Sequence, residues 1–393
     1  MRWATSVLTS MARRPDLRAA LIGAVLLLGG WSKGPRTWHV SPAGADTSAG
    51  TAASPFRTIG KAAAMVRPGD TVLVGDGVYI DEDGDGAVVK VRRGGTPAAP
   101  VIFRAANRWK AKLDGQGGRT PKGIDFDGAG AAFVRIEGFE ITGMGNPGVP
   151  PSGRGSASGI DLYDGGHDVV IVDNHIHDIG RVCTLSTNTN GQVGIFVQQP
   201  NVVIERNVIH SIGRFFPGER GCRYDAGFTG YRTLDHGIYL NGGSHGADGA
   251  VVRDNVVYDT PHGWGVQLYP GRLLGVRIEH NTFAAGNPAR GHSAIVLDAE
   301  IVAGTIANNV FHAPPGGYAI EANGFAGTIT IAGNVTSGRA ITNVLYRRGL
   351  GARDNDTGVA LAFADTARGD YRLRAGTRAG DAGPRVVTGA HAH

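Results

Sequence analysis

The chain has very little cysteine, and it has no lysine beyond its first third. Cys183 and Cys222 are the only cysteines among 393 residues, and no lysine follows Lys122. The net charge of +5 comes mostly from scattered arginines, and no block of basic residues occurs anywhere. Proteins that bind nucleic acid usually concentrate basic charge in a patch or stripe. We therefore expect no nucleic-acid partner.

Long hydrophobic runs are scarce, and one stands near the start, at residues 19–28 after Arg13, Arg14 and Arg18. Such a run is short for a membrane span and fits the apolar region of a signal peptide. Residues 1–35 are therefore predicted to be a signal peptide or, alternatively, a retained anchor that makes the only membrane contact. Either segment predicts a secreted, periplasmic or cell-envelope protein.

A five-residue phrase that begins Gly-Ile, Gly-Val or Ala-Ile recurs along the chain. Its second and fourth positions are apolar in every copy, while the third and fifth are mostly polar or aromatic, as in a strand with one buried face. The copies occupy residues 123–127, 159–163, 194–198, 237–241, 265–269, 294–298 and 319–323. Repetition at intervals of this size indicates stacked coils.

A second apolar phrase follows each copy and contains an asparagine, which predicts two short strands that meet at a corner. The corner residues are Asn174, Asn207, Asn255, Asn281, Asn309 and Asn334, with Phe139 in their place in an earlier copy. We therefore predict an all-β, single-stranded parallel β-helix of about eight or more coils. An antiparallel sandwich would explain the many glycines but not the fixed order of two phrases in each period.

The outward positions of the Gly-Ile phrase form a polar and aromatic strip that suits sugar binding, because aromatic faces pack on sugar rings and amides and carboxylates bind hydroxyls. An ordinary solvated face is the alternative. The predicted substrate-binding residues are Asp161, Tyr163, Gln198, Asn241, Trp264, Gln267 and Tyr269, together with Arg220 from a long loop.

Asp235 and His236 directly precede one copy of the phrase, and two residues separate His236 from the outward Tyr239. β-Elimination of a uronan requires that the carboxylate be neutralised, the C5 proton abstracted and the leaving oxygen protonated. Arg220, Arg223 or Arg232 could serve the first step, His236 the second and Tyr239 the third. Alternatively, His236 has a structural role and Asp235 orients it.

Two further predictions concern metal binding and the cysteines. Asp125, Asp127 and Asp161 could lie on adjacent coils and hold Ca²⁺, although they could equally be solvated, or Asp125 and Asp161 could form a hydrolase acid pair. Cys183 and Cys222 fall in loops of neighbouring coils, so a disulfide is predicted in an exported chain, with two free thiols as the alternative.

The N-terminal part resembles the opening of exported parallel β-helix proteins, including polysaccharide lyases of the family 9 and family 6 type. The resemblance rests on residues 38–46 (WHVSPAGAD), 68–72 (PGDTV) and 77–79 (GVY). It implies a right-handed β-helix domain over residues 36–384, with an N-terminal cap and a disordered tail at 385–393. The ending at residues 370–374 resembles a cap common at the far end of such helices.

The resemblance implies calcium and a lysine base, but the later coils contain no lysine, so that base cannot be carried over. We expect a monomeric exported enzyme that acts on an acidic polysaccharide or oligosaccharide, by β-elimination or C5 epimerisation. A glycoside hydrolase that uses groove carboxylates and a non-catalytic glycan-binding envelope protein remain the alternatives.

Overall fold

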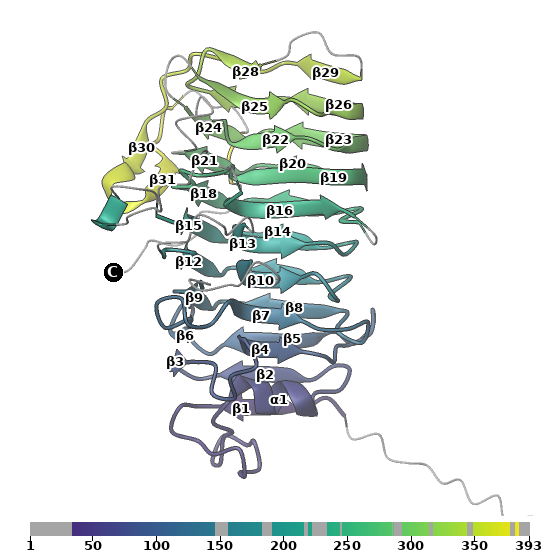
Figure 1. Ribbon diagram of the computed structural model, residues 1–393, viewed down its shortest axis with the longest axis vertical. Helices are drawn as coiled ribbons and strands as arrows, with labels where there is room; N and C mark the ends of the chain where they lie inside the picture. Colours follow the sequence, from purple (N-terminus) through teal and green to yellow (C-terminus); the bar gives the residue numbers. More distant parts are fainter. Residues whose placement is uncertain are drawn as a thin grey trace, which may run out of the picture. The chain divides into compact units, whose positions relative to one another are not determined.

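The chain winds into stacked coils (Figure 1). Successive coils contribute strands to three sheets, and the strands within each sheet run parallel to one another. The computed structural model describes residues 34–145, 156–182, 191–215, 219–221, 234–243, 246–284, 286, 293–313, 317–343, 349–377 and 382–384. Most of the predicted signal segment and the whole predicted tail lie outside these residues. No helix in the described ranges is both long enough and apolar enough to span a membrane.

The three faces are called here the first, second and third sheets. The first sheet contains the Gly-Ile phrases and consists of β4 (Ala87–Val91), β7 (Lys122–Phe126), β10 (Ala157–Leu162), β13 (Gln192–Val197), β16 (His236–Gly242), β19 (Val266–Leu274), β22 (Ile295–Leu297), β25 (Tyr318–Ala322) and β28 (Ala340–Thr342). The second consists of β1 (Thr37–Val40), β2 (Thr71–Val74), β5 (Val101–Ala105), β8 (Val134–Glu137), β11 (Val170–Val172), β14 (Val203–Glu205), β17 (Val251–Arg253), β20 (Arg277–Glu279), β23 (Glu300–Ala307), β26 (Ala326–Ala332) and β29 (Leu350–Arg353). The third consists of β3 (Gly77–Tyr79), β6 (Ala111–Asp114), β9 (Glu140–Thr142), β12 (His175–Ile179), β15 (Val208–Ile212), β18 (Val256–Tyr258), β21 (Thr282–Ala284), β24 (Val310–His312) and β27 (Val335–Thr336). Because β19 turns the corner and pairs with both β22 and β23, the first two sheets are hydrogen-bonded into one.

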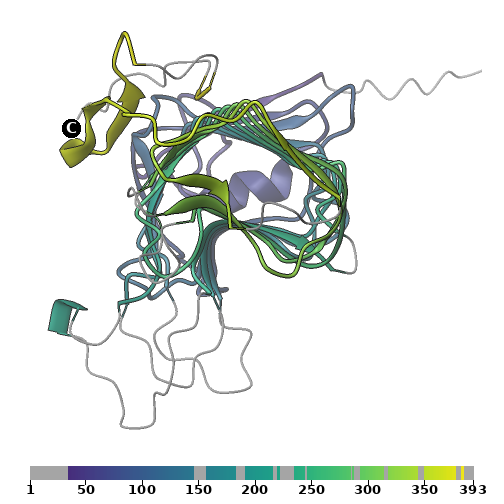
Figure 2. The same cartoon turned by 90° about the horizontal axis from the view of Figure 1, so that it is seen from above.

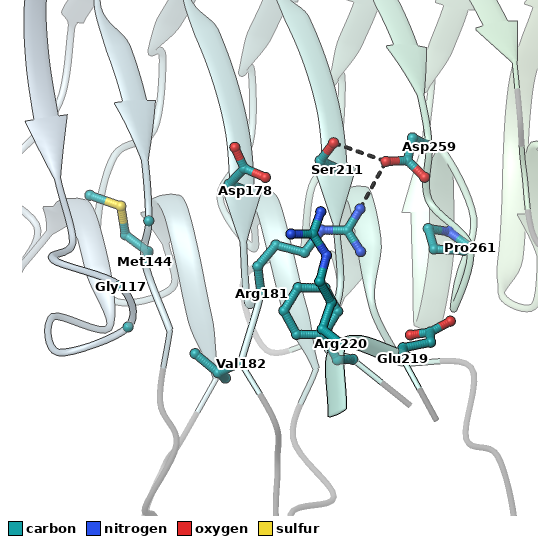
Figure 3. Close-up of a pocket in the computed structure, with 13 residues that line it drawn as sticks. Gly117, Met144, Asp178, Arg181, Val182, Ser211, Glu219, Arg220, Asp259 and Pro261 are labelled. Atoms are coloured by element: carbon teal, nitrogen blue, oxygen red, sulfur yellow. Dashed lines mark hydrogen bonds and ion pairs between the residues drawn. The ribbon is translucent and has the colours of Figure 1, made fainter. Parts of the chain in front are cut away.

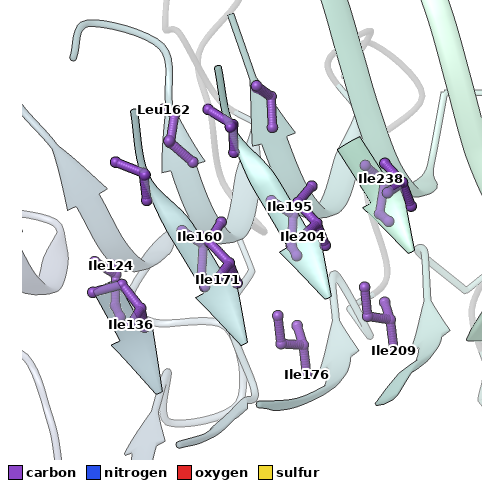
Figure 4. Close-up of a cluster of buried hydrophobic side chains, with 14 of the residues drawn as sticks. Ile124, Ile136, Ile160, Leu162, Ile171, Ile176, Ile195, Ile204, Ile209 and Ile238 are labelled. Carbon is purple, nitrogen blue, oxygen red and sulfur yellow. The ribbon is translucent and has the colours of Figure 1, made fainter. Parts of the chain in front are cut away.

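Apolar side chains stack from coil to coil inside the helix, as the alternation of the Gly-Ile phrase predicts. Ile124, Ile160, Ile195 and Ile238 are paired in register along the first sheet and are at most 2% exposed. Isoleucines of the other sheets face them across the interior (Figure 4). Each buried isoleucine contributes about 1.5–3 kcal/mol, so this continuous stack holds neighbouring coils together.

The predicted asparagine corner is confirmed, with one refinement. Asn207 donates through Nδ2 to the carbonyl of Ile171 at 2.9 Å, and its own Oδ1 accepts the backbone N–H of Asn174 at 3.0 Å. The left-handed backbone belongs to the preceding residue, with φ of 55° at Asp173 and 55° at Arg206. The preceding residue therefore makes the bend, and the asparagine satisfies the backbone groups that the bend leaves unpaired.

Short elements close the coils and cover the third sheet. Helix α1 (Ile59–Met65) begins at Thr58, whose hydroxyl accepts the N–H of Lys61, and it lies across the N-terminal opening of the coils (Figure 2). The antiparallel pair β30 (Phe363–Asp365) and β31 (Asp370–Leu373) packs on the outside of the third sheet, where Tyr371 contacts Tyr258 at 4.9 Å between ring centroids. The C-terminal segment therefore covers the side of the helix rather than its far end, which corrects the expectation of a far-end cap.

Candidate functional site

The outer face of the first sheet carries the predicted row of polar and aromatic side chains in register. Asp125, Asp161, Phe196, Tyr239 and Gln267 occupy equivalent places on five successive strands. We call these residues, together with Lys122, Tyr163, Gln198, Asn241 and Tyr269, the first-sheet strip. The strip therefore runs across five neighbouring strands of the first sheet, in the middle coils of the helix.

At the N-terminal end of the strip, one lysine joins two carboxylates. Lys122 Nζ lies 2.7 Å from Asp125 Oδ1 and 3.5 Å from Asp161 Oδ1. Asp161 is only 3% exposed, and it also accepts hydrogen bonds from the Ser158 hydroxyl at 3.0 Å and the Tyr163 N–H at 3.1 Å. These contacts bring a cation, a half-buried carboxylate and a buried carboxylate to one point of the strip.

The electrostatics of this group raise the pKa of both Lys122 and Asp161. Burial acts to lower the pKa of Lys122, but Asp161 and Asp125 outweigh burial and raise it. Burial raises the pKa of Asp161, against the lowering effects of Lys122 and Ser158. Lys122 is therefore held as an ammonium between the two carboxylates, and Asp161 binds a proton more readily than an exposed carboxyl group does.

Aromatic rings continue the strip toward the C-terminal coils. Tyr163 contacts Phe196 at 5.9 Å between centroids, and Phe196 meets Tyr239 edge-on at 5.0 Å. Tyr163 and Tyr269 are each 42% exposed, whereas Tyr239 is half-buried. Burial and the neighbouring Tyr269 raise the pKa of Tyr239, so its phenol stays protonated. The two outer tyrosines thus present free ring surface of the kind that packs on sugars.

His236 is not on the surface, which corrects its predicted role as the proton-abstracting base. Its side chain is 1% exposed and stacks on Trp264 at 5.6 Å, and Nδ1 accepts the N–H of Trp264 at 3.3 Å. Burial lowers the pKa of His236 to about 3, so the ring is neutral. A hydrogen bond joins it to Gln267 of the strip. The structural alternative therefore holds, and His236 positions Gln267 from beneath the surface.

Asp235 is fully buried and binds Arg214 instead of His236 or a substrate. Arg214 Nη2 lies 2.7 Å from Asp235 Oδ1, and Arg214 Nε lies 2.9 Å from Oδ2. The same carboxylate accepts the backbone N–H groups of Gln192 at 2.9 Å and Arg214 at 3.0 Å. Asp235 therefore joins three segments of the chain, and its predicted place at the groove is wrong.

Trp264 is likewise covered, at 5% exposed, so it does not join the exposed tyrosines. Its indole N–H donates to Ser293 Oγ at 3.0 Å and to Glu321 Oε2 at 3.1 Å. Gln198 is also nearly buried, at 7% exposed, while Asn241 and Gln267 are half-buried. Of the predicted substrate-binding side chains, Tyr163 and Tyr269 are thus the most accessible on the strip.

The three predicted calcium ligands do not all meet at one point. Asp127 Oδ2 is bound to Arg92 at 2.8 Å, and the ammonium of Lys122 lies between Asp125 and Asp161. A basic side chain is thus paired with each of these carboxylates, and calcium binding there stays a prediction.

Two clusters are not among the sites predicted from the sequence. The first contains Lys122, whose i,i+3 spacing to Asp125 is a signal that the sequence does contain. Within the described ranges, the acidic oxygens that converge, all within 4.8 Å of one another, belong to Asp81, Asp83 and Asp85. Their D-x-D-x-D-G spacing could have been noticed. Asp81 accepts backbone N–H groups and Asp85 is paired with Lys90 at 3.2 Å, so local contacts account for this cluster.

Several predicted residues fall elsewhere. Arg223, Arg232, Cys183 and Cys222 lie outside the described residues. Arg220 is described, but it lines a hollow beside the third sheet and not the strip.

Comparisons with known proteins agree with this fold. Residues 38–212 match the family model described as the Pel9A-like right-handed β-helix region. A curated relative, the uncharacterized protein YwoF of Bacillus subtilis strain 168, is 27% identical over 146 residues, which are 36% of this chain and 28% of that protein's length. The chain therefore spans less than a third of the curated relative that it matches.

Solved structures extend the likeness over most of the chain. The crystal structure of pectate lyase Pel9A has a TM-score of 0.53 at 16% identity and covers 87% of this chain and 90% of its own. A glycoside hydrolase has a TM-score of 0.54 at 10% identity, with 87% and 99% coverage. An alginate lyase from Paenibacillus sp. str. FPU-7 has a TM-score of 0.50 at 15% identity, with 82% and 95% coverage. At such identities these structures establish the fold alone: the chain is a right-handed parallel β-helix, and its residues 38–212 match the Pel9A-like β-helix region.

Proposed function

We propose that this protein is an exported enzyme that acts on an acidic, uronate-containing polysaccharide, by β-elimination or C5 epimerisation, on the outer face of the first sheet. The observation that carries the proposal is the first-sheet strip itself. Lys122 with two carboxylates stands at one end of it, and exposed tyrosines follow along the same face. The match of residues 38–212 to the Pel9A-like region and the pectate and alginate lyases among the similar structures support this substrate class.

The chemistry begins with the substrate carboxylate. A uronate resists loss of its C5 proton until its carboxylate is neutralised, and the Lys122 ammonium is the cation that the strip offers. Asp125, which is more exposed than Asp161, is placed to take the proton. Asp161, whose pKa is raised by burial, then protonates the leaving oxygen in an elimination.

The rest of the strip binds the chain. Tyr239 lies two strands beyond Asp161 in the register, so we assign it to binding rather than to proton transfer. Tyr163 and Tyr269 pack on sugar rings, and Asn241 and Gln267 bind hydroxyls.

A hydrolase is the second candidate, because one specific feature favours it. Asp125 and Asp161 are neighbours in register on adjacent coils, and the pKa of Asp161 is raised. A glycoside hydrolase needs such a pair, with one carboxyl group holding a proton and the other ionised. The same residues would then act without abstracting the C5 proton.

Incubation with a panel of uronans distinguishes these functions. A lyase releases unsaturated ends, which absorb in the ultraviolet, and an epimerase changes the C5 configuration seen by NMR without cutting the chain. Reducing ends without unsaturation would select the hydrolase instead. If a uronan binds to the protein but is not chemically changed, the protein is a non-catalytic glycan-binding protein and the enzymatic proposal is wrong.

A further inference from the structure

A hollow lies beside the third sheet, where β12 and β15 end and just beyond β18 (Figure 3). Its volume is about 800 Å³, and none of its lining residues belongs to the first-sheet strip. Volumes of this size are typical of pockets that hold small organic ligands. The hollow is therefore large enough to be a binding site of its own.

One wall is a row of polar side chains that repeats from coil to coil. Asp178, Ser211 and Asp259 have φ of 53°, 54° and 52°, the left-handed region. The corresponding place on the preceding coil holds Gly143, with φ of 74°. Left-handed backbone also occurs at other turns of the coils, as at Asp173 and Arg206, so it marks here the bend at which the chain leaves the third sheet. These bends place three polar side chains along one wall of the hollow.

These side chains are held in fixed positions. The Ser211 hydroxyl donates to Asp259 Oδ2 at 2.9 Å, and Arg181 Nη2 donates to the same oxygen at 2.8 Å (Figure 3). Arg181 and Arg220 both lie over the ring of Phe215, at 5.5 and 5.7 Å from its centroid. The hollow therefore offers a hydroxyl, carboxylate oxygens and guanidinium N–H groups in a defined arrangement around an aromatic ring.

Each carboxylate among the described lining residues has a basic side chain beside it. Arg181 is paired with Asp259, and His177 Nδ1 lies 2.8 Å from Asp178 Oδ2. Glu219 Oε2 lies 3.2 Å from His262 Nε2, and Arg220 adds a second guanidinium group to the lining. A ligand with a net charge would thus gain little, while hydroxyl groups find both donors and acceptors.

We propose that this hollow is a second carbohydrate-binding site, which takes a neutral sugar unit. We distinguish it from the first-sheet strip, for which an acidic sugar is the proposed ligand. A polysaccharide-active protein with both sites would contact two kinds of sugar on two sides of the helix. The proposal concerns binding only, so it stands or falls independently of the reaction on the strip.

Calorimetric titration of the full chain with neutral gluco-, manno-, galacto- and xylo-oligosaccharides tests the proposal. We expect saturable binding of at least one neutral sugar, with the same affinity at low and high salt, because no net charge is involved. Arg220→Met should weaken this binding about tenfold by removing guanidinium hydrogen bonds. Tyr163→Ala, which alters the first-sheet strip, should leave it unchanged.

A second variant protects the test against misfolding. Ser211→Gly removes the hydroxyl and also relieves the left-handed strain, so the variant should fold at least as well as the wild type and still bind the neutral sugar more weakly. The proposal is overturned if no neutral sugar binds, or if Tyr163→Ala abolishes the binding while Arg220→Met and Ser211→Gly keep it. Salt-sensitive binding of acidic sugars alone, lost in Arg220→Met, would also overturn it and make the hollow an anion site.

Discussion

At the scale of single residues, the buried pair of Asp235 and Arg214 joins segments that are far apart in the sequence. Asp235 is 0% exposed and accepts bonds from the Arg214 side chain and from two backbone N–H groups. A buried carboxylate is tolerated only when its charge and lone pairs are all satisfied. Asp235 therefore stabilises the fold and does not bind a substrate.

The variant Asp235→Asn should destabilise the protein by about 3–5 kcal/mol, because it leaves the Arg214 charge buried without its counter-ion. Asp127→Asn is the matched control, since Asp127 pairs with Arg92 on the surface and should contribute less than about 1 kcal/mol. Urea denaturation of both variants measures the difference. Equal losses would mean that Asp235 does not hold the loops.

His236 makes a second prediction, which concerns pH. Its folded pKa of about 3 lies below the usual value of 6.5, so its neutral form stabilises the fold above pH 6.5 and this contribution falls as the pH drops toward 3. From pH 7 to pH 5 the free energy of unfolding should fall by about 2 kcal/mol from this residue. In His236→Gln, the free energy of unfolding should fall by about 2 kcal/mol less over this pH range than in the wild type. Urea denaturation at the two pH values measures the difference. An unchanged fall in the variant would place His236 in contact with water.

At the scale of elements, the asparagine row ties each coil to the next. Asn255 donates through Nδ2 to the carbonyls of Ile204 and Arg253, both at 2.9 Å, and accepts the N–H of Asn207 at 2.9 Å. These groups lie where the chain leaves β14 and β17 and turns toward the third sheet. The row therefore replaces sheet hydrogen bonds at the corner between the second and third sheets.

Asn255→Ala should cost about 3 kcal/mol, because it leaves several buried backbone groups unpaired. Asn107→Ala, at an exposed asparagine bound to Asp76, should change stability by less than about 1 kcal/mol. Thermal or urea unfolding compares the two. If Asn255→Ala is as mild as the control, the corner is held by the stacked isoleucines alone.

The regular parts of these elements were predictable from the sequence, but the surroundings of the residue that precedes each Gly-Ile phrase were not. The alternation of apolar and polar residues identified Ile160 and Ile195 as inward residues, because successive side chains of a strand point to opposite faces of the sheet. Lys122, Ser158 and His236 occupy equivalent register positions where the chain enters the first sheet. The exposure of a side chain at this position depends on which side chain of the next coil packs against it. Trp264, for example, covers His236. Contacts between distant residues of this kind are not encoded in a local pattern.

At the scale of the whole β-helix, the exposed tyrosines define a length. Tyr163 and Tyr269 occupy the same position of the phrase three coils apart, a distance of about 14 Å from the spacing of adjacent strands. Both project from the first-sheet strip, so a chain that contacts both must run along the helix axis.

Tyr163→Ala and Tyr269→Ala should each weaken the binding of a long uronan chain about tenfold through lost ring stacking. A disaccharide is too short to reach both rings, so the double variant should bind it no more weakly than the worse single variant. Leu274→Ala is the matched control, because Leu274 is also 42% exposed but lies on the part of β19 that joins the second sheet. Equal effects on short and long chains would contradict binding along the axis.

In the proposed function, Lys122 is the cation that receives an acidic sugar. The most direct measurement is kcat/KM on the uronan that the wild-type protein converts, compared between Lys122→Met and Lys112→Met. Lys112 is a matched lysine that pairs with Asp114 at 3.4 Å on the third sheet, away from the strip. We predict a loss of about a hundredfold for Lys122→Met, and near wild-type activity for Lys112→Met. Undiminished activity in Lys122→Met, or an equal loss in both variants, would contradict the account.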